Sequence, residues 1–477
     1  MIQARSFAGK AVAVFGLART GQAAVAALKA GGADVFAWDD KIETHDGAVK
    51  SGAQVVAPYD WPWVRLAGLV LSPGVPLTHP EPHPIVLRAR DAKVSVIGDF
   101  ELFAHEVRDP SSGVPLAPTI AVTGTNGKST TTALIGHILK SCGFDVQIGG
   151  NIGRAVLELE PPGARTVYVT EISTFQIDLA PSFRPDVTVL LNLSPDHLDR
   201  HGSMEAYAAV KERLVRQTSR DGQVLIGVDD TYTSSIFSRA SSAGGAAATP
   251  VSVGKVLGRG IFVVDGVLYD AQVQRATRVL ELAKAQKLPG AHNWQNAALA
   301  YAACKPFVRD VRHITEAITT FPGLAHRLEE VRRIGRVRFV NDSKATNSDA
   351  AERALACFSD VYWIAGGRPK EGGIASLSGH YRRVRKAYLI GEAAQDFAKS
   401  LDGHAGYEIA GTLEQAVMHA AHDAGLSQAP EPVVLLSRLA LLSINSEISR
   451  HAATRFARWS RRSICPRCER RHEPVAH

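Results

Sequence analysis

The stretch from Thr119 to Thr130, which reads TIAVTGTNGKST, constrains the fold of this chain most strongly. Its β-branched first half predicts a buried strand, and the residues that follow it have the apolar spacing of a helix. A strand, a glycine-rich turn, a Lys-Ser pair and a helix are the parts of a P-loop, whose backbone N–H groups surround phosphate oxygens. The sequence therefore predicts an α/β nucleotide-binding domain. The alternative is a glycine-rich turn that carries an exposed lysine.

Individual residues of this loop have separate expected roles. The glycines let the backbone approach a phosphate, Lys128 can reach the β- and γ-phosphates, and the Ser129 hydroxyl can bind Mg²⁺. The spacing G-T-N-G-K-S is shorter than the usual GxxxxGK[ST]. The predicted nucleotide-binding residues of the loop are Gly124, Thr125, Asn126, Gly127, Lys128, Ser129 and Thr130.

Alternation of strands and helices divides the chain into three parts, and 477 residues suffice for about three domains. The first part opens with a strand, a glycine-rich turn, a helix and a second strand that ends at Asp39. The alternation restarts at the P-loop and again after the segment FPGL, which begins at Phe321. Such alternation predicts mostly parallel sheets covered by helices, and the pair Asp265-Gly266 predicts one hairpin.

We therefore expect an α/β protein with two Rossmann-like domains on either side of a P-loop domain. The expected boundaries are 1–106 for the first Rossmann-like domain, 107–323 for the central ATP-binding domain, 324–437 for the second Rossmann-like domain and 438–477 for a basic tail.

Charge and cysteine content narrow the class of protein. From Arg438 onward, nine arginines and three glutamates supply +6 of the net charge of +7, so the basic balance does not argue for a nucleic-acid partner. No apolar stretch predicts a membrane span or a signal peptide. Five scattered cysteines suit a reducing cytoplasm, and the pair Cys465 and Cys468 is weak evidence for a metal. We expect a cytoplasmic protein, without a membrane partner.

Two further segments carry groups that can bind metal. Glu171 ends an apolar run beside the P-loop, where a carboxylate can bind the Mg²⁺ of a nucleotide or can simply be buried. The segment SPDHLDRH, which begins at Ser194, places His197 after another strand, and Lys211 follows it. No zinc spacing is present, so a loop histidine and a solvated lysine remain the alternatives.

Polar residues also gather after two strands of the third part. NDSKATN, from Asn341 to Asn347, and GGRPK, from Gly366 to Lys370, follow apolar runs, at the strand ends where α/β domains bind ligands. Lys344 and Lys370 can hold carboxylates. A helix N-cap near Asn347 and solvated lysines are the alternatives.

Taken together, these motifs resemble the Mur ligases. The matching motifs are IGDFELF (97–103), GTNGKST (124–130), GGNIG (149–153), EISTFQ (171–176), SPDHLDRH (194–201), GAHNWQN (290–296), AHR (325–327) and NDSKATN (341–347). They follow the family order over roughly nine-tenths of the chain. DSKATN resembles in particular the branch of the family that adds D-glutamate.

This resemblance implies a reaction and its substrates. ATP would phosphorylate the carboxylate of UDP-N-acetylmuramoyl-L-alanine, and the amine of D-glutamate would displace phosphate from the acyl phosphate. This amide ligation belongs to peptidoglycan precursor synthesis and requires ATP and Mg²⁺. A monomer is expected.

The resemblance also assigns roles to single residues. Lys128, His197 and Lys211 would be catalytic. Ser129 and Glu171 would hold one Mg²⁺, and His197 and Lys211 would hold a second, with Lys211 carbamylated. Asn296, Arg327 and Asp342 would contact ATP. Thr20, Asp39 and Gly74 would bind the UDP moiety, Asn151 the reacting end of that substrate, and Lys344, Thr346 and Lys370 the D-glutamate carboxylates.

The chain departs from the family after Ser437. The family continues VVLLS with a motif like PACASFDQF, which lines the amino-acid pocket, whereas this chain reads RLALLSINSEIS. A nucleotide sequence can be written that encodes SRLALLSINSEIS. If one cytosine is restored after its Ser437 codon, the same sequence encodes SPACASFDQFRNF. We therefore expect a reading-frame shift at Ser437/Arg438; a divergent tail is the alternative.

Two other functions stay open at this point. The altered C-terminus would be consistent with a weakened or inactive nucleotide-binding remnant of the same ligase. A sister Mur ligase that adds another amino acid is the second alternative, and DSKATN argues against it. A simple P-loop NTPase or a Rossmann dehydrogenase predicts neither EISTFQ nor DSKATN.

Overall fold

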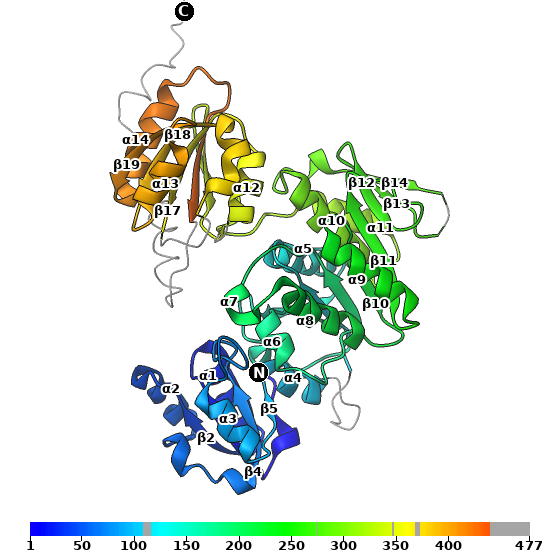
Figure 1. Cartoon of the computed structure of the whole chain (residues 1–477). Helices are drawn as coiled ribbons and strands as arrows, with labels where there is room; N and C mark the ends of the chain where they lie inside the picture. Colours follow the sequence, from blue (N-terminus) through cyan, green and yellow to red (C-terminus); the bar gives the residue numbers. More distant parts are fainter. Residues whose placement is uncertain (108–115, 274, 346–347, 368–372, 439–477) are drawn as a thin grey trace, which may run out of the picture. The chain divides into compact units, whose positions relative to one another are not determined.

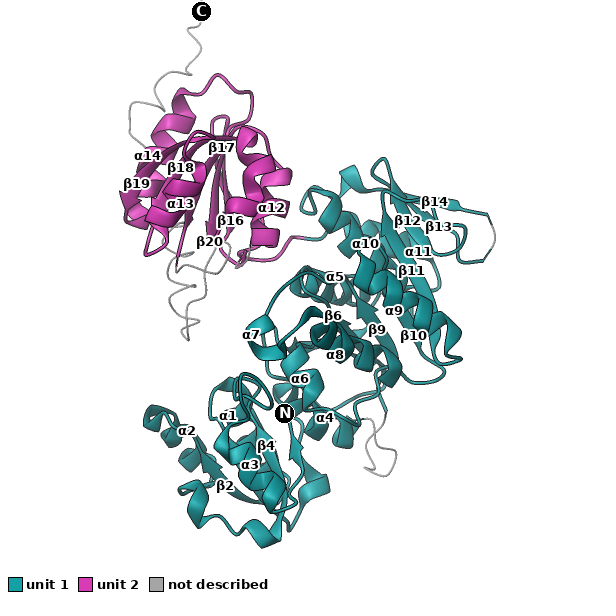
Figure 2. Cartoon of the chain, in the orientation of Figure 1, with its two compact units in different colours: residues 1–321 teal, residues 322–477 magenta. Residues whose placement is uncertain are grey.

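The computed structural model describes residues 1–107, 116–273, 275–345, 348–367 and 373–438. The chain forms two compact units, Met1–Phe321 and Pro322–His477, which are coloured separately in Figure 2. The first unit contains two sheets and the second unit contains one (Figure 1). The alternation of strands and helices in the sequence thus yields mostly parallel sheets, as predicted.

The first sheet of unit 1 has five parallel strands in the order β3-β2-β1-β4-β5. The strands are β1 (Ala11–Phe15), β2 (Asp34–Trp38), β3 (Gln54–Val55), β4 (Leu66–Leu71) and β5 (Val96–Ile97). The accompanying helices are α1 (Arg19–Ala30), α2 (His45–Lys50), α3 (Pro84–Asp91) and α4 (Asp99–Val107). β1 is buried from Val12 to Phe15, which explains its continuous apolar sequence.

The second sheet of unit 1 has nine strands in the order β14-β13-β12-β11-β10-β9-β6-β8-β7. The strands are β6 (Thr119–Thr123), β7 (Asp145–Gly150), β8 (Thr166–Glu171), β9 (Val187–Leu190), β10 (Gln223–Gly227), β11 (Ala247–Val253), β12 (Ile261–Val264), β13 (Val267–Asp270) and β14 (Thr277–Glu281). Strands β6 to β12 pair in parallel, and β12, β13 and β14 form an antiparallel meander.

Seven helices accompany this sheet within the described residues. They are α5 (Lys128–Ser141), α6 (Thr174–Asp178), α7 (Leu198–His201), α8 (Met204–Gln217), α9 (Thr231–Ser242), α10 (Ala291–Cys304) and α11 (Val311–Thr319). The hairpin predicted at Asp265-Gly266 is confirmed: Val264 pairs with Val267, and the two turn residues have φ values of 50° and 72°. Both values are positive, as a two-residue type I′ turn requires.

The sheet of unit 2 has the order β15-β16-β20-β17-β18-β19. The strands are β15 (Glu329–Ile334), β16 (Val337–Asp342), β17 (Val361–Gly366), β18 (Val384–Ile390), β19 (Gly406–Gly411) and β20 (Val433–Arg438), with helices α12 (Ser348–Ala356), α13 (Ala394–Leu401) and α14 (Leu413–Leu426). β20, the last described strand, lies at the centre and pairs in parallel with β16 and β17. Ser437, where the sequence departs from the family pattern, is therefore buried in the middle of this sheet.

Candidate active site

Two glycines of the P-loop stand where no other residue fits. Gly124 and Gly127 have φ values of 145° and 87°, in the region that favours glycine. A Cβ on Gly127 would lie 2.3 Å from Oδ1 of Asn296, and a Cβ on Gly124 would lie 2.9 Å from Cβ of Leu191. The loop therefore needs glycine both for its backbone path and for the close approach of α10 and β9.

The P-loop is held in shape by the segment that follows β9. The Thr125 N–H donates to the Asn192 carbonyl at 2.8 Å, and the Asn126 N–H donates to Oδ1 of Asn192 at 3.0 Å. Nζ of Lys128 folds back over the loop and donates to the carbonyls of Gly124 and Thr125 at 2.9 and 2.7 Å. The lysine thus lies directly above the turn that would surround the phosphates.

Several polar groups around the loop are buried. Ser129 and Thr130, both 8% exposed, lie in the first turn of α5. Nδ2 of Asn126 is a buried donor that has no hydrogen-bond partner among the described residues. Burying an amide without a partner is unfavourable, so a donor of this kind fits a ligand that brings oxygen atoms, such as a phosphate.

The start of α10 packs a second amide cluster against the loop. Nδ2 of Asn296 donates to Oδ1 of Asn293 at 3.0 Å, while Gln295 receives a hydrogen bond from Asn192 at 3.1 Å. Gln295 in turn donates to the Asp229 carboxylate at 2.9 Å. The motif GAHNWQN therefore supports the P-loop through Asn192, and Asn296 lies beside Gly127.

Glu171 ends β8, the neighbour of β6, and is 3% exposed. Its Oε1 accepts a hydrogen bond from Nδ2 of Asn151 at 2.8 Å, and the Asn151 N–H donates to the Glu171 carbonyl at 2.8 Å. Its Oε2 is buried and has no hydrogen-bond partner among the described residues. A buried carboxylate oxygen in this state fits a hard cation such as Mg²⁺.

Lys211 lies on α8 and is 1% exposed. Its Nζ donates to Oγ1 of Thr123 at 3.2 Å and to the Gly124 carbonyl at 3.1 Å, and it lies 4.8 Å from the centre of the Tyr207 ring. Burial lowers the pKa of this amine well below its usual value, and the charge of Lys128 lowers it further. The charged form of the Lys211 amine is therefore disfavoured at this buried position beside the P-loop.

His197 precedes α7 and has a φ of 53°. Its ring packs edge-on against Phe175 at 5.1 Å, and its Nε2 lies 3.6 Å from the Asp196 carboxylate. On the other side, His201 stacks on Phe175 at 5.6 Å and shares a hydrogen bond with Thr174 at 2.8 Å. Burial lowers the pKa of His201 to about 4, so this ring is neutral and structural.

The predicted UDP-binding residues lie at the carboxyl ends of β1, β2 and β4. The Asp39 carboxylate accepts hydrogen bonds from the N–H groups of Leu17 at 2.5 Å and Lys41 at 2.8 Å. Thr20 is in the first turn of α1, and Gly74 is an exposed turn residue after β4. These turns share one edge of the sheet, the edge at which α/β folds bind nucleotides.

Unit 2 holds the remaining predicted residues. The Asp342 carboxylate is 6% exposed and accepts a hydrogen bond from the Leu328 N–H at 3.1 Å. Burial raises its pKa to about 7, while the charge of Arg327 acts in the opposite direction. Lys344 is exposed, and its N–H donates to the His326 carbonyl at 3.1 Å. Thr346 and Lys370 lie outside the described residues.

The sequence did not single out Asn192, Tyr207, Arg19 or Arg200. Asn192 holds the P-loop, and the Tyr207 hydroxyl lies 3.1 Å from the hydroxyl of Thr125. The two arginines bind backbone carbonyls in distant segments. A carbonyl acceptor leaves no mark on the sequence, so the residue pattern gave no signal for these contacts.

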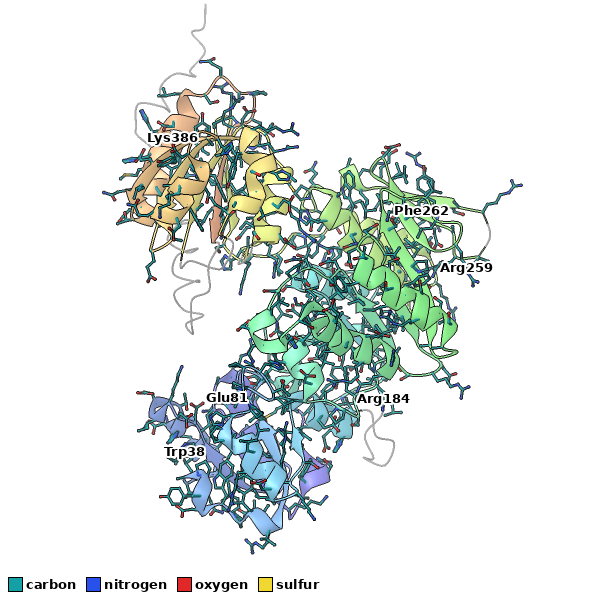
Figure 3. The ribbon with its side chains drawn as sticks, viewed as in Figure 1. Trp38, Glu81, Arg184, Arg259, Phe262 and Lys386 are labelled. Atoms are coloured by element: carbon teal, nitrogen blue, oxygen red, sulfur yellow. The ribbon has the colours of Figure 1, made fainter. Side chains whose placement is uncertain are left out.

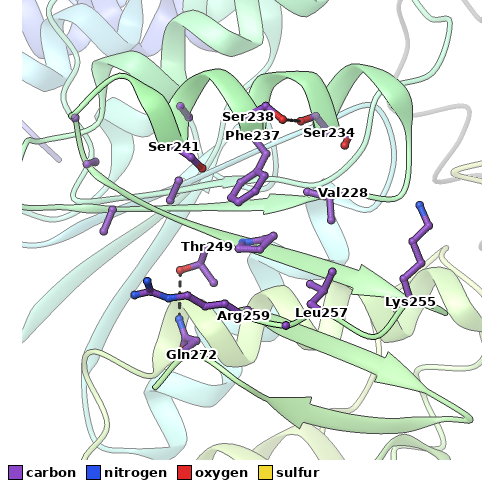
Figure 4. Close-up of a pocket in the computed structure, with 18 of the residues that line it drawn as sticks. Val228, Ser234, Phe237, Ser238, Ser241, Thr249, Lys255, Leu257, Arg259 and Gln272 are labelled. Carbon is purple, nitrogen blue, oxygen red and sulfur yellow. Dashed lines mark hydrogen bonds between the residues drawn. The ribbon is translucent and has the colours of Figure 1, made fainter. Parts of the chain in front are cut away.

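A pocket of about 900 Å³ lies elsewhere in unit 1, between α9, β11 and the loop before β12 (Figure 4). Phe237, Leu257, Lys255 and Arg259 are among its lining residues. None of the predicted site residues lines this pocket. Among the described residues, no group of three or more His, Cys, Asp or Glu side chains forms a metal site.

Comparison with known proteins first identifies the protein family. Residues 122–304, which contain the P-loop, Glu171, Lys211 and Asn296, match the family model of the Mur ligase middle domain. The solved structure of the UDP-N-acetylmuramate–alanine ligase MurC of Thermotoga maritima covers 95% of this chain and all of its own chain, with a TM-score of 0.58 and 19% identity. MurF of Acinetobacter baumannii gives a TM-score of 0.58 with 16% identity, covering 95% of this chain and 93% of its own. At these identities the structural likeness shows the fold alone.

Relatives with higher sequence identity identify the group within this protein family. The UDP-N-acetylmuramoylalanine–D-glutamate ligase of Caulobacter sp. (strain K31) is 51% identical over 438 residues, which cover 92% of this chain and 93% of the relative. The ligase of the same name from Nitrobacter winogradskyi is 51% identical over 439 residues with the same coverage. The chain therefore belongs to the UDP-N-acetylmuramoylalanine–D-glutamate ligases of the Mur ligase family.

Proposed function

We propose that this protein is an ATP-dependent ligase that joins D-glutamate to UDP-N-acetylmuramoyl-L-alanine during the synthesis of peptidoglycan precursors. The observation that carries this proposal is the similarity, over 92% of the chain, to ligases with that activity in their names. The P-loop, the buried Glu171 and the buried Lys211 support this proposal, because they would supply the phosphate-binding and metal-binding groups that such a ligase needs.

The proposed reaction has two steps. A carboxylate oxygen of the L-alanyl group attacks the γ-phosphorus of ATP, the bond from that phosphorus to the β,γ-bridging oxygen breaks, and ADP leaves. The amine nitrogen of D-glutamate then attacks the acyl carbon, the bond to the phosphate oxygen breaks, and phosphate and one proton leave. Both steps depend on positioning and on neutralisation of phosphate charge, which Lys128 and the N–H groups of the P-loop would provide.

Ser129, Glu171, His197 and Lys211 would hold Mg²⁺. The buried Oε2 of Glu171, which has no partner among the described residues, fits this role. A bound Mg²⁺ neutralises charge on the transferring phosphoryl group. A lysine amine binds no cation while protonated. Once deprotonated, the Lys211 nitrogen would attack the carbon of CO₂ and release one proton, which leaves an anionic carbamate. The lowered pKa of Lys211 supports carbamylation at this position.

The other proposed contacts follow the family pattern. Asn151 would orient the reacting end of the UDP substrate, because it lies against Glu171. Thr20, Asp39 and Gly74 would bind the UDP moiety. Asn296, Arg327 and Asp342 would contact ATP, and Lys344, Thr346 and Lys370 would bind the D-glutamate carboxylates.

Three domains would share these tasks, with residues 1–106 binding the UDP substrate, 107–323 binding ATP and 324–437 binding D-glutamate. The division is supported by the three sheets, which extend over residues 11–97, 119–281 and 329–438. We further propose a monomer that acts in the cytoplasm. Within the described residues, no helix has the length and apolar composition needed to cross a bilayer.

Phosphate release tests the proposed function. Purified protein is supplied with ATP, Mg²⁺, UDP-N-acetylmuramoyl-L-alanine and D-glutamate, and each is omitted in turn. We expect release that needs both substrates. Release from ATP and Mg²⁺ alone, at the same rate as in the complete mixture, would instead identify a simple NTPase.

The C-terminal tail gives a separate prediction. Replacing the residues from Arg438 onward by a tail that begins PACASFDQFRNF should lower KM for D-glutamate at least about tenfold, because the family motif lines the amino-acid pocket. The affinity for ATP should change less than about twofold. Steady-state kinetics and calorimetry measure the two effects. An unchanged KM for D-glutamate would show that the present tail is a functional divergence.

A further inference from the structure

Two arginines connect the first sheet of unit 1 to the second. Arg19, the first residue of α1, extends its guanidinium to the end of β7 and the loop that follows it. There it donates to the carbonyls of Gly153 at 2.5 Å and Gly150 at 3.2 Å. These two glycines flank Asn151, whose side chain holds Glu171.

Arg200 connects the two sheets in the other direction, from a helix beside the second sheet to a turn of the first. It lies in α7, three residues after His197, and its guanidinium donates to the carbonyls of Gly74 at 3.1 Å and Val75 at 3.2 Å. The same guanidinium lies 4.5 Å from the centre of the Phe175 ring, against which His197 also packs. The arginine is therefore fixed on one side by the turn after β4 and on the other by an aromatic ring.

Both contacts depend on the planar guanidinium group, which distinguishes arginine from lysine. A guanidinium offers several N–H groups in a rigid plane, so one side chain can bind two neighbouring carbonyls at once. Each of these arginines does so, and each binds a turn of the other sheet. In the first sheet's domain, Arg19 is adjacent to the proposed UDP contact Thr20, and Gly74 is itself an acceptor of Arg200. In the second, the segments that follow β7 and β9 contain Asn151 and His197.

We propose that Arg19 and Arg200 are positioning residues that couple binding of the uridine nucleotide substrate to the arrangement of the ATP and Mg²⁺ site. The inference deepens the proposed function and rests on it. When the UDP substrate orders the turns at residues 16–20 and 72–75, the arginines transmit that order to Asn151 and His197. The bound substrate thereby prepares the site that activates its carboxylate.

The thermodynamic coupling between binding of the UDP substrate and binding of ATP tests this proposal. The dissociation constant of a non-hydrolysable ATP analogue with Mg²⁺ is measured by calorimetry with and without saturating UDP-N-acetylmuramoyl-L-alanine. The ratio of the two constants is the coupling factor, which is the same whichever ligand is bound first. For the unaltered protein, we expect the UDP substrate to lower the dissociation constant of the ATP analogue at least about fivefold.

The variants Arg19→Lys and Arg200→Lys keep the charge but lose the planar pair of donors. In each variant the coupling factor should fall to below about twofold, and in the double variant to about one. Affinity for the analogue alone should stay within about twofold, because neither arginine touches the P-loop. The matched control is Arg184→Lys, because Arg184 donates to the carbonyls of Pro181 and Phe183, close to it in the chain (Figure 3).

Thermal unfolding of all variants verifies that they are folded. A coupling factor that is near one in the unaltered protein, or that both lysine variants retain, would overturn the inference. Equal loss in Arg184→Lys would also overturn it, because the effect would then be unspecific. Ligase activity of the unaltered protein is measured in parallel, so failure of the proposed function is recognised separately from failure of the coupling.

Discussion

Lys211→Met is expected to lower kcat about a thousandfold or more without lowering the thermal stability of the protein. The amine of Lys211 is buried beside the P-loop, where burial lowers its pKa, and only its carbamate could serve as an anionic metal ligand. Methionine has a similar length but cannot add CO₂. The buried amine also disfavours the folded state through desolvation, so an apolar replacement should not lower the midpoint of unfolding by more than about 2 °C.

The measurement combines ligase kinetics, thermal unfolding and detection of the carbamate by carbon-13 NMR after equilibration with labelled bicarbonate. The unaltered protein should show one carbamate signal that Lys211→Met lacks. Lys140→Met is the control, because Lys140 is an exposed residue in the last turn of α5. Activity in Lys211→Met within about tenfold of the unaltered protein would refute the proposed role.

Lys128→Met should lower kcat/KM for ATP by about a thousandfold. Nζ of Lys128 lies over the P-loop, bound to the carbonyls of Gly124 and Thr125. When a nucleotide enters, this ammonium lies at the turn and would neutralise charge on the transferring phosphoryl group. The loop itself should keep its shape, because Asn192 holds it through Thr125 and Asn126.

Kinetics and nucleotide binding together separate the role of Lys128 from a general loss of folding. Binding of ADP should weaken only about tenfold, whereas turnover should fall much further, because the lysine acts mainly on the γ-phosphate. Lys140→Met again serves as the control, at the opposite end of the same helix. Equal losses in ADP binding and in kcat/KM would show that Lys128 merely stabilises the loop.

The sequence predicted what depends on local patterns. A strand, a glycine-rich turn and a helix are specified within twelve residues, and the structure forms β6, the P-loop and α5 there. The hairpin at Asp265-Gly266 also follows from its turn residues alone. Neither feature requires knowledge of distant contacts.

The burial of Lys211 was not predictable in the same way. Taken alone, a lysine in an amphipathic helix is most simply read as solvated. Its partners, Thr123 and Gly124, are nearly ninety residues away in the chain, so only the packing of α8 against β6 and β9 reveals that the amine is buried. Family resemblance pointed to this lysine, and the structure shows that its side chain is buried.

The arginine contacts show a second limit of sequence reading. Arg19 and Arg200 bind backbone carbonyls, which every residue type has, so no partner residue signals the contact. Arg200 lies inside the recognised motif SPDHLDRH, and Arg19 lies in the glycine-rich segment after the first strand, yet the pattern gave neither arginine a role. Only coordinates that bring the two sheets of unit 1 together show what they bind.

Transfer of oxygen-18 tests the central claim most directly. UDP-N-acetylmuramoyl-L-alanine labelled in its carboxylate is turned over with ATP, Mg²⁺ and D-glutamate, and the released phosphate is analysed by mass spectrometry. If the carboxylate attacks the γ-phosphorus, each phosphate carries one labelled oxygen from the substrate. Unlabelled phosphate would mean that water attacks ATP instead, and the protein would then be a nucleotide hydrolase that does not activate the carboxylate.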